Sequence, residues 1–227
     1  MSRIKVIVIG VGHLGKHHAR LYHDMPNVEL AGIVDIDAKS AQETADQYQV
    51  PFFTELEQIS IPFDAASIVV PTSEHYRIAK SLLLTGIHLL VEKPFTKTLA
   101  EAQELTQLAQ QKNLIVSVGH VERFNPAFRQ IEQQLNHPRF IEVHRLGPFP
   151  KRGTDVGVVL DLMIHDIDII LNIVKSPICD IRAVGIPVLT PYEDIANARL
   201  EFENGCVANV TASRVSIKAM RKIRIFQ

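Results

Sequence analysis

Short apolar runs alternate with segments of helical period along the first half of the chain. The apolar runs cover residues 4–10, 28–35, 64–71, 88–94 and 114–119, and the helical segments cover 13–24, 38–49, 74–86 and 98–113. The apolar runs lack strict polar alternation, which is typical of strands that are buried on both faces. Alternation of such strands with helices predicts an α/β domain with a doubly wound parallel sheet, over residues 1–121.

The pattern changes from about residue 123. Strand-like runs become longer, one long helix is predicted over 156–174, and two alternating runs flank Asn204-Gly205, a strong hairpin signal. These features predict an α+β domain with a mostly antiparallel sheet over residues 122–227. The chain ends in the strand-like RKIRIFQ. We therefore expect this sheet to be incomplete, either because the chain is part of a longer protein or because its second domain is unusually short.

Composition narrows the class of protein. The 227 residues carry a formal net charge of −1, with 46% hydrophobic and 22% charged residues. With this balance of charges the protein has no strong positive electrostatic potential that would attract nucleic acid or an anionic membrane. No apolar run is long enough to span a bilayer, and we expect a cytoplasmic protein. Cys179 and Cys206 are too few for a disulfide framework, and we expect two free, buried thiols.

The segment VIVIGVGHLGKHHARL contains the spacing GxGxxG at Gly10, Gly12 and Gly15. It follows a predicted strand and opens a predicted helix, which is the context of a Rossmann dinucleotide site. There the glycines permit a tight turn, approach of the pyrophosphate and close packing of helix on strand. The helix N-terminus favours phosphate. His13 and Leu14 lie inside the motif and are predicted cofactor contacts; ordinary turn glycines are the alternative.

Asp35 ends the second predicted strand, about 20 residues after Gly15. An acid at this distance is expected to bind the adenosine ribose hydroxyls. Its charge would repel a 2′-phosphate, and Asp37 would add to the repulsion, so NAD is favoured over NADP. The alternative is that Asp35 caps the following helix.

The fifth predicted strand leads into Glu92-Lys93-Pro94. Open α/β sheets bind ligands beyond the carboxyl ends of their strands. Lys93 is therefore predicted to lie where a nicotinamide ring and a substrate meet, with Glu92 beside it. A surface lysine at a strand end is the alternative.

Residues 158–174 are apolar yet carry three aspartates and a histidine. On a helix at about 100° per residue, Asp161, His165, Asp168 and Asn172 share one narrow stripe, with Asp166 outside it. The opposite side is predicted to hold Leu160, Met163, Ile164, Ile167, Ile170 and Leu171. An aspartate near a histidine can fix its tautomer and make it a better base. A solvated face with an Asp–His pair is the alternative, and a zinc site lacks a third ligand.

Several segments together resemble the glucose–fructose oxidoreductase/inositol dehydrogenase (Gfo/Idh/MocA) family. They appear in the family's order and extend over nearly all of the chain. The matching segments are GVGHLG (10–15), VVPTSEHYRIA (69–79), VEKPFTKTLAEA (91–102), VGHVERFNP (118–126) and LDLMIHDID (160–168). EKP followed later by D-x-x-x-H is the most specific part of this resemblance. The glycine loop is shared with many folds.

The resemblance implies roles for particular residues. Lys93, Asp161 and His165 would surround the substrate hydroxyl and the nicotinamide, and the Lys-Pro bond is often cis in relatives. The PTxxH segment would line the cofactor cleft, with contacts from Pro71, Thr72 and His75, although a first-turn surface position is the alternative for His75. Relatives are commonly about half as long again. Many carry glycine-rich sequence where this chain has VGVVLDLMIHD, a difference that concerns the substrate more than the chemistry.

Further candidates for substrate binding are predicted from their positions in the expected topology. His120, Arg123 and Asn125 lie just past the last strand of the first domain, although Asn125-Pro126 also reads as a helix start. Asp168 belongs to the polar stripe. Lys151 and Arg152 lie in a loop before the striped helix, where they would bind a substrate phosphate or carboxylate or simply be solvated.

These observations predict an NAD-dependent oxidoreductase that removes hydride from a secondary hydroxyl of a sugar. LDLMIHDID and VGHVERFNP look most like family members that oxidise UDP-N-acetylglucosamine at its 3-hydroxyl, and a free sugar or inositol is the alternative substrate. His165 is the favoured base, oriented by Asp161, with Lys93 polarising the oxygen; the reverse assignment stays open. A non-catalytic NAD-binding regulator is the alternative of another class. No metal is predicted, and a homodimer or homotetramer through the C-terminal sheet is expected.

Overall fold

The computed structural model describes residues 3–149 and 156–227. The chain forms two compact units, Met1–Gly119 and His120–Gln227. Each unit has its own sheet and its own hydrophobic core.

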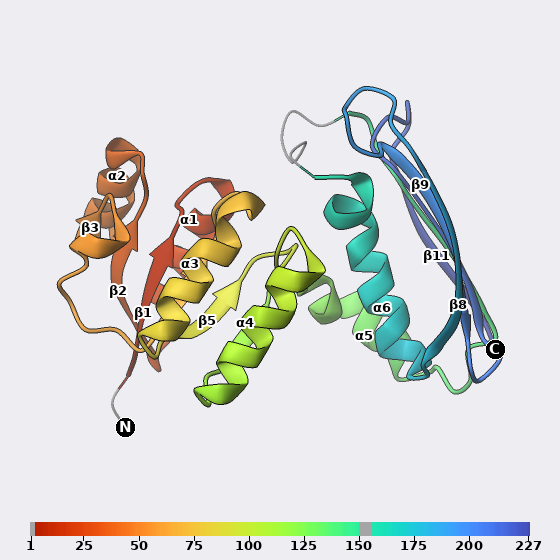
Figure 1. The fold of residues 1–227 in the computed structure, drawn as a ribbon, viewed down its shortest axis with the longest axis horizontal. Coiled ribbons are helices and arrows are strands. Elements are labelled where there is room, and N and C mark those ends of the chain that lie inside the picture. The colour runs from red at the N-terminus through yellow and green to blue at the C-terminus, as the bar shows by residue number, and fades with distance from the viewer. Residues whose placement is uncertain (1–2, 150–155) are drawn as a thin grey trace. The chain divides into compact units, whose positions relative to one another are not determined.

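The first unit is a six-stranded sheet in the order β3-β2-β1-β4-β5-β6, with every neighbouring pair parallel. This confirms the predicted doubly wound sheet (Figure 1). Its strands are β1 (Ile4–Ile9), β2 (Val28–Val34), β3 (Phe52–Phe53), β4 (Ala65–Ile68), β5 (His88–Val91) and β6 (Val116–Val118). Its helices are α1 (His13–Asp24), α2 (Ala38–Tyr48), the 3₁₀ turn η1 (Leu56–Gln58), α3 (Thr72–Leu84) and α4 (Leu99–Gln111). The sequence pattern missed β3 and η1, which are too short to show a period.

Helices cover both faces of this sheet. Ile7 and Ile9 of β1 face the core shared with α3 and α4, whereas Val8 faces the core shared with α1 and α2. Burial on both sides is the reason that these strands read as continuous apolar runs. Gly86 and Asn113 follow the ends of α3 and α4 with φ of 88° and 54°, so both predicted helix ends are confirmed.

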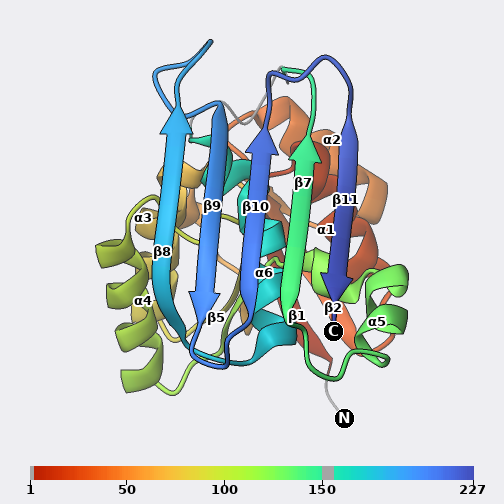
Figure 2. The same ribbon diagram turned by 90° about the vertical axis from the view of Figure 1, so that its right-hand side faces the viewer.

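The second unit is a five-stranded sheet in the order β11-β7-β10-β9-β8, antiparallel except for the pair of β7 and β10. This confirms the predicted mostly antiparallel sheet (Figure 2). The strands are β7 (Phe140–Leu146), β8 (Ile178–Ile186), β9 (Ile195–Phe202), β10 (Val207–Ser213) and β11 (Met220–Phe226). The helical elements are η2 (Val121–Phe124), α5 (Pro126–Glu132), η3 (Val159–Met163) and α6 (Ile164–Val174).

Apolar side chains of α6 pack on one face of this sheet, with Ile169, Ile170 and Ile173 in the core. Figure 2 shows the opposite face, which no helix of this unit covers. Two expectations are wrong in detail. Leu171, assigned to the apolar side of the helix, is 43% exposed because the core lies nearer Ile169 and Ile173. Cys179 is exposed, since it lies at a register shift of edge strand β8, whereas Cys206 is buried.

The predicted helix over 156–174 contains a π-helical turn at η3 before α6 begins. The backbone N–H of Ile164 donates to the carbonyl of Val159, five residues back. A π turn holds an extra residue, so a spacing of 100° per residue does not apply there. Such turns often occur at functional sites.

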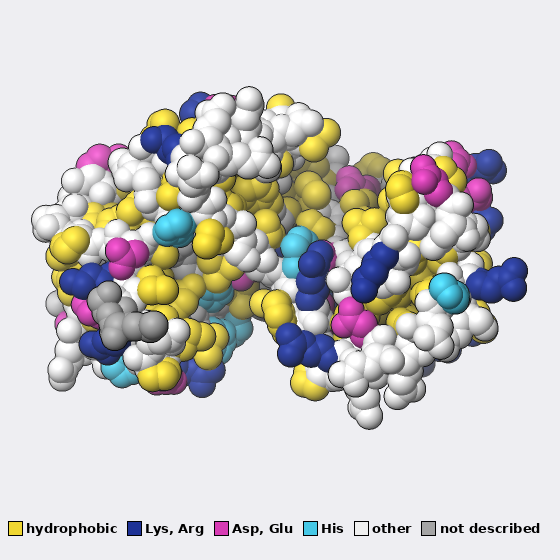
Figure 3. Space-filling view, turned by 90° about the horizontal axis from the view of Figure 1, so that it is seen from below, with side chains coloured by type: hydrophobic (Ala, Val, Ile, Leu, Met, Phe, Trp, Pro, Cys, Tyr) yellow, Lys and Arg dark blue, Asp and Glu magenta, His cyan; other side chains and the backbone are white. Residues whose placement is uncertain are grey.

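Acidic and basic side chains are interspersed on the face drawn in Figure 3, with no single field of one sign. This matches the near-zero net charge. Within residues 3–149 and 156–227, no helix combines the length and apolar character needed to cross a bilayer.

Candidate active site

The glycine turn between β1 and α1 has the geometry that a dinucleotide phosphate requires. Gly10 has φ of 89°, and a Cβ there would lie 2.5 Å from the carbonyl oxygen of Val69. A Cβ on Gly15 would overlap the carbonyl of Gly10. At Gly12, by contrast, a Cβ would meet nothing within 4 Å. The first and third glycines therefore allow close packing, and the second leaves open space at the N-terminus of α1.

A cavity of about 610 Å³ opens beside this turn. Gly10, Gly12, Asp35 and Pro71 line it, so the structure brings these four predicted residues together. Other lining residues come from the ends of β1, β2, β3 and β4, from η1 and from α3: Ile9, Val34, Ile36, Thr54, Glu55, Leu56, Glu57, Val69, Val70, Glu74, Arg77 and Ile78. The volume is typical of a small-molecule or cofactor site.

Carboxylates dominate the polar lining of the cavity. The Asp35 carboxylate accepts hydrogen bonds from the backbone N–H of Val11 (2.7 Å) and of Asp37 (2.9 Å). Glu55, Glu57 and Glu74 also line it, and Arg77 donates to Glu74 at 3.1 Å. This surplus of negative charge disfavours an additional 2′-phosphate.

Asp37, and not Asp35, caps α2. The Asp37 side chain accepts from the Lys39 N–H and from the Ser40 hydroxyl, and these hydrogen bonds hold the pKa of its carboxyl below the ordinary value. The alternative that gave Asp35 the capping role is therefore wrong. Asp35 is left to face the cavity.

Three further cofactor candidates lie in the first turns of two helices. His13 and Leu14 are exposed in the first turn of α1. The His13 ring packs against the His17 ring, with ring centroids 5.3 Å apart. Thr72 begins α3 and is buried.

His75 has 1% exposure, so the alternative that made it a surface residue is wrong. Its Nδ1 lies 2.9 Å from the carbonyl oxygen of Pro94, and its Nε2 lies 2.9 Å from that of Val70. The ring therefore links the start of α3 to the segment that follows β5. This contact was not predictable from the sequence, because the two carbonyl groups lie 19 and 5 positions away from His75.

Glu92, Lys93 and Pro94 leave the end of β5, and the Lys93-Pro94 bond is cis. Lys93 is partly exposed, whereas Glu92 is buried. The Glu92 Oε2 accepts from the Lys93 backbone N–H at 3.3 Å, and its Oε1 lies 3.1 Å from the Nε2 of His18. Burial raises the pKa of Glu92, but the His18 hydrogen bond and charge, together with Lys93, outweigh it and leave the pKa below its ordinary value.

The second unit carries the other predicted catalytic pair. Asp161 lies in the π turn η3, and His165 lies in the first turn of α6. Both are partly exposed. Lys93, by contrast, belongs to the first unit.

A charged cluster joins η2 to α6. Arg123 donates through Nε and NH2 to both Asp168 oxygens, at 2.7 and 2.6 Å, and His120 Nδ1 lies 4.0 Å from the same carboxylate. The pKa of Arg123 is raised by this hydrogen-bonded carboxylate. The structure thus brings together three predicted substrate-binding residues, His120, Arg123 and Asp168. Both carboxylate oxygens of Asp168 already accept hydrogen bonds from Arg123.

Two further candidates have structural roles or lie outside the described part. Asn125 accepts from the Ala127 N–H at 3.1 Å and caps α5, with Pro126 in the first turn, so the capping alternative is confirmed. Asn172 donates to Glu132 at 2.7 Å. Lys151 and Arg152 lie outside the described residues.

Sequence reasoning missed a buried ion pair behind the helix. Asp166 is fully buried and receives Nε and NH2 of Arg145, at 2.7 and 2.6 Å. Glu122 lies 3.9 Å from Arg145 and accepts from Arg221 at 2.8 Å. An aspartate outside the polar stripe of a core helix was a signal that a buried cation would be needed.

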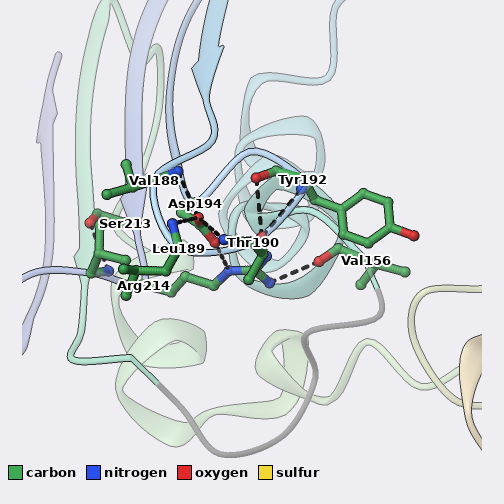
Figure 4. A network of polar contacts seen from close by, with 9 residues as sticks. Val156, Val188, Leu189, Thr190, Tyr192, Asp194, Ser213 and Arg214 are labelled. Carbon is green, nitrogen blue, oxygen red and sulfur yellow. Dashed lines mark hydrogen bonds and ion pairs between the residues drawn. The ribbon is translucent and has the colours of Figure 1, made fainter.

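A second buried pair holds the chain just before η3. The Asp194 carboxylate accepts from the N–H groups of Val188, Leu189 and Thr190 and from Arg214 Nε at 2.7 Å (Figure 4). Arg214 NH1 in turn donates to the Val156 carbonyl at 2.8 Å. Although burial raises the pKa of Asp194, these hydrogen bonds outweigh it and hold the pKa far below the ordinary range. The network fixes the entry to the element that carries Asp161.

No group of three or more His, Cys, Asp or Glu side chains in the described part of the chain is arranged to hold a metal ion. The residues at the first site do fit NAD. Gly12 leaves space for the pyrophosphate, α1 presents its N-terminus, and Asp35 faces the cavity where ribose hydroxyls would bind.

Comparisons with known proteins place the chain among NAD-binding oxidoreductases. Residues 4–120 match the family model "Oxidoreductase family, NAD-binding Rossmann fold", and residues 128–226 match "GFO/IDH/MocA C-terminal domain". The UDP-N-acetylglucosamine 3-dehydrogenase of Acidithiobacillus ferrooxidans is 40% identical over 100% of this chain and 72% of its own sequence. Its solved structure has a TM-score of 0.91 over 100% of this chain and 74% of the other.

More distant relatives act on inositols. The scyllo-inositol 2-dehydrogenase (NAD⁺) of Bacillus subtilis is 27% identical over 94% of this chain and 68% of its own. The scyllo-inositol dehydrogenase of Lactobacillus casei, solved with NAD(H) and scyllo-inositol, has a TM-score of 0.85 at 22% identity, over 99% of this chain and 74% of the other. At that identity the likeness concerns the fold.

Proposed function

The chain belongs to the Gfo/Idh/MocA oxidoreductase family, and from this membership we propose that it is an NAD-dependent dehydrogenase of a nucleotide sugar, oxidising the 3-hydroxyl of UDP-N-acetylglucosamine. The single observation that carries this substrate is the 40% identity, over the whole chain, to an enzyme of that name. The Lys93, Asp161 and His165 set supports turnover, because a protein that only senses the dinucleotide has no need of it.

In this proposal the first unit binds the cofactor. The N–H groups at the start of α1 bind the pyrophosphate, with Gly12 allowing its approach. Asp35 accepts hydrogen bonds from the adenosine ribose, and Pro71 lines the same cavity. When bound, NAD supplies a nicotinamide ring that accepts a hydride from the substrate carbon.

The second unit supplies the base. His165 takes the proton of the substrate hydroxyl, and Asp161 orients its imidazole and stabilises the imidazolium that forms. Lys93 donates a hydrogen bond to the same oxygen and stabilises its developing negative charge. We propose that these groups, from different units, converge on the substrate. With Lys93 as the base instead, the pH dependence of kcat/KM would follow a lysine and persist in His165→Gln.

The experiment is absorbance at the reduced-nicotinamide band while NAD is mixed with UDP-N-acetylglucosamine, other nucleotide sugars, inositols and free hexoses. We expect reduction with UDP-N-acetylglucosamine. Reduction with an inositol or free sugar alone would replace the substrate and keep the reaction. NAD binding without reduction of any of them would contradict catalysis and favour a regulatory protein.

Variants test the site. Lys93→Ala and His165→Ala should each lower kcat by about 100-fold or more, the usual loss for acid–base groups, with NAD affinity nearly unchanged. The exposed Lys97→Ala and His137→Ala are matched controls that should keep wild-type turnover. Unchanged activity in both site variants would rule out this assignment.

We further propose self-association through the open face of the second sheet, as a homodimer or homotetramer in the cytoplasm. The two free cysteines fit a reducing compartment. Phe140 and Phe226 pack side by side on this sheet, with ring centroids 5.9 Å apart. Light scattering should give a multiple of the 25.4 kDa chain, and Phe226→Asp should lower it.

A further inference from the structure

A buried polar network lies beneath the Glu92-Lys93-Pro94 segment. His18, in the second turn of α1, bridges two strand ends of the sheet. Its Nδ1 lies 2.7 Å from the Ser67 hydroxyl on β4, and its Nε2 lies 3.1 Å from Glu92 Oε1 just past β5. The side chains of His18 and Glu92 are only 16% and 11% exposed, and Ser67 is fully buried. The network therefore joins the helix that begins at the glycine turn to the segment that carries Lys93.

The chemistry of the partners fixes the direction of these hydrogen bonds. An ionised carboxylate can only accept, so His18 must carry a proton on Nε2 to bond Glu92. Nδ1 then accepts from the Ser67 hydroxyl in the neutral ring. A charge-assisted bond of this kind, shielded from water, is stronger than a neutral one. The Glu92 carboxylate is thereby held in one position.

Glu92 in turn holds the backbone of Lys93. Its Oε2 accepts from the Lys93 N–H at 3.3 Å. The carboxylate lies against Gly119, where a Cβ would be 2.6 Å from Oε1, so no other residue fits there without displacing it. On the other side of Lys93, the Pro94 carbonyl lies 2.9 Å from His75 Nδ1. Buried side chains thus hold the N–H group of the lysine and the carbonyl group of the residue that follows it.

We propose that His18 is a positioning residue for the dehydrogenase reaction: through Glu92, it fixes the backbone from which Lys93 reaches the substrate. This role rests on the proposed function of Lys93. In this role His18 affects the rate of the chemical step, although it lies on the helix proposed to bind the cofactor phosphates. Misplacing a catalytic group by about 1 Å can cost about 100-fold in rate.

Two near-isosteric variants separate the two arms of the ring. In His18→Gln the side-chain amide nitrogen reaches the position of Nε2 and can still donate to Glu92. In His18→Asn the side chain ends near Nδ1, so it can bond Ser67 but not Glu92. We expect His18→Asn to lower kcat by about 10- to 100-fold, with the Kd for NAD changed by less than about threefold. His18→Gln should keep kcat within about threefold of wild type.

His23→Asn and His23→Gln are the matched controls, because His23 is exposed in the last turn of the same helix. Both should leave kcat unchanged. Equal losses in His18→Gln and His18→Asn would overturn the proposal, because packing or the Ser67 arm would then matter and not Glu92. A loss of NAD affinity in His18→Asn would also overturn it, since His18 would then act through the cofactor loop.

A spectroscopic measurement on the wild-type protein decides the question independently of the turnover of the variants. A long-range ¹H–¹⁵N spectrum of the wild-type protein, with the His18 signals assigned by their loss in His18→Gln, should show a proton on Nε2. A neutral ring protonated on Nδ1 alone would overturn the positioning role, because it leaves no donor for Glu92. Absence of wild-type turnover with every sugar would count against the proposed function, and the tautomer would still test the His18–Glu92 link.

Discussion

Asp35 shows how one side chain combines a structural and a binding role. Its two oxygens accept backbone N–H groups from the glycine turn and from the start of α2, while the carboxylate remains at the lining of the cavity. The acid thus ties the turn to the second strand, and in the proposed complex its charge disfavours the 2′-phosphate of NADP. Further carboxylates around the cavity act in the same direction.

Asp35→Asn should weaken NAD binding by about tenfold, since hydrogen bonds to charged groups contribute about 1.5–3 kcal/mol. Loss of the charge also removes repulsion of a 2′-phosphate. We therefore expect the ratio of Kd values for NADP and NAD to fall. Fluorescence titration with both dinucleotides measures it, with the exposed Glu43→Gln of α2 as the control. A ratio that stays at the wild-type value would exclude Asp35 as the discriminating group.

Gly119→Ala should lower kcat by about tenfold or more, because its Cβ would push the buried Glu92 carboxylate away from His18 and the Lys93 N–H. Gly147→Ala makes the same chemical change where a Cβ meets nothing within 4 Å, so it is the matched control. Steady-state kinetics of both variants provide the test. Equal activity in the two would mean that the Glu92 position does not limit the reaction.

At the scale of elements, α6 is attached to its surroundings by carboxylates as well as by apolar packing. Asp166 binds Arg145 on β7, and Asp168 binds Arg123 on η2. Both pairs are bidentate, which fixes orientation as well as distance. The two ion pairs therefore prevent α6, which carries His165, from rotating about its own axis. A helix packed only by aliphatic side chains would be less constrained in this rotation.

Asp166→Ala should lower the free energy of unfolding by about 3 kcal/mol, because it leaves the buried Arg145 without its bidentate partner. Glu122, 3.9 Å from Arg145, offsets part of the loss. The exposed pair of Asp180 and Arg182 is the control, and Asp180→Ala should cost less than about 1 kcal/mol. Urea unfolding measures both. Similar losses in the two variants would show that burial of the Arg145 pair has no special weight.

At the scale of the whole molecule, the residues of the proposed site are divided between two units with separate cores. The first unit holds the glycine turn, Asp35 and Lys93, and the second holds Asp161, His165 and the Arg123–Asp168 pair. Each set is positioned by its own sheet. The buried Asp194–Arg214 network contributes to the second unit by fixing the loop after β8 and the approach to η3.

The pH dependence of stability should report this network. The pKa of Asp194 is lowered on folding, so its contribution is fully present above the unfolded value of about 3.9 and is lost as pH falls from there toward the folded pKa. We expect Asp194→Asn to be less stable than wild type at pH 6 and the difference to shrink toward pH 3. Thermal melts at both values measure it. A difference that does not change with pH would contradict the assignment.

The sequence by itself determined the longer helices and strands, the two sheet types and the glycine turn with its acid. These features depend on local spacing: a period of 2 or 3.6, a cap such as Asn125, or glycines spaced by two and then three residues at a strand end. Neighbours along the chain suffice to define them. The resemblance to the family rests on the same short motifs. The π turn was not predictable, because its hydrogen-bond pattern leaves no distinct residue signature.

Only the tertiary structure decided which buried polar groups meet. His18 and Glu92 are 74 positions apart, and Asp166 and Arg145 are 21 apart. Periodicity can say that Asp166 faces away from a polar stripe, but not which cation compensates its burial. The pairing depends on how the strands order themselves and where each helix packs, and these follow from the summed packing of the whole core and not from any short segment.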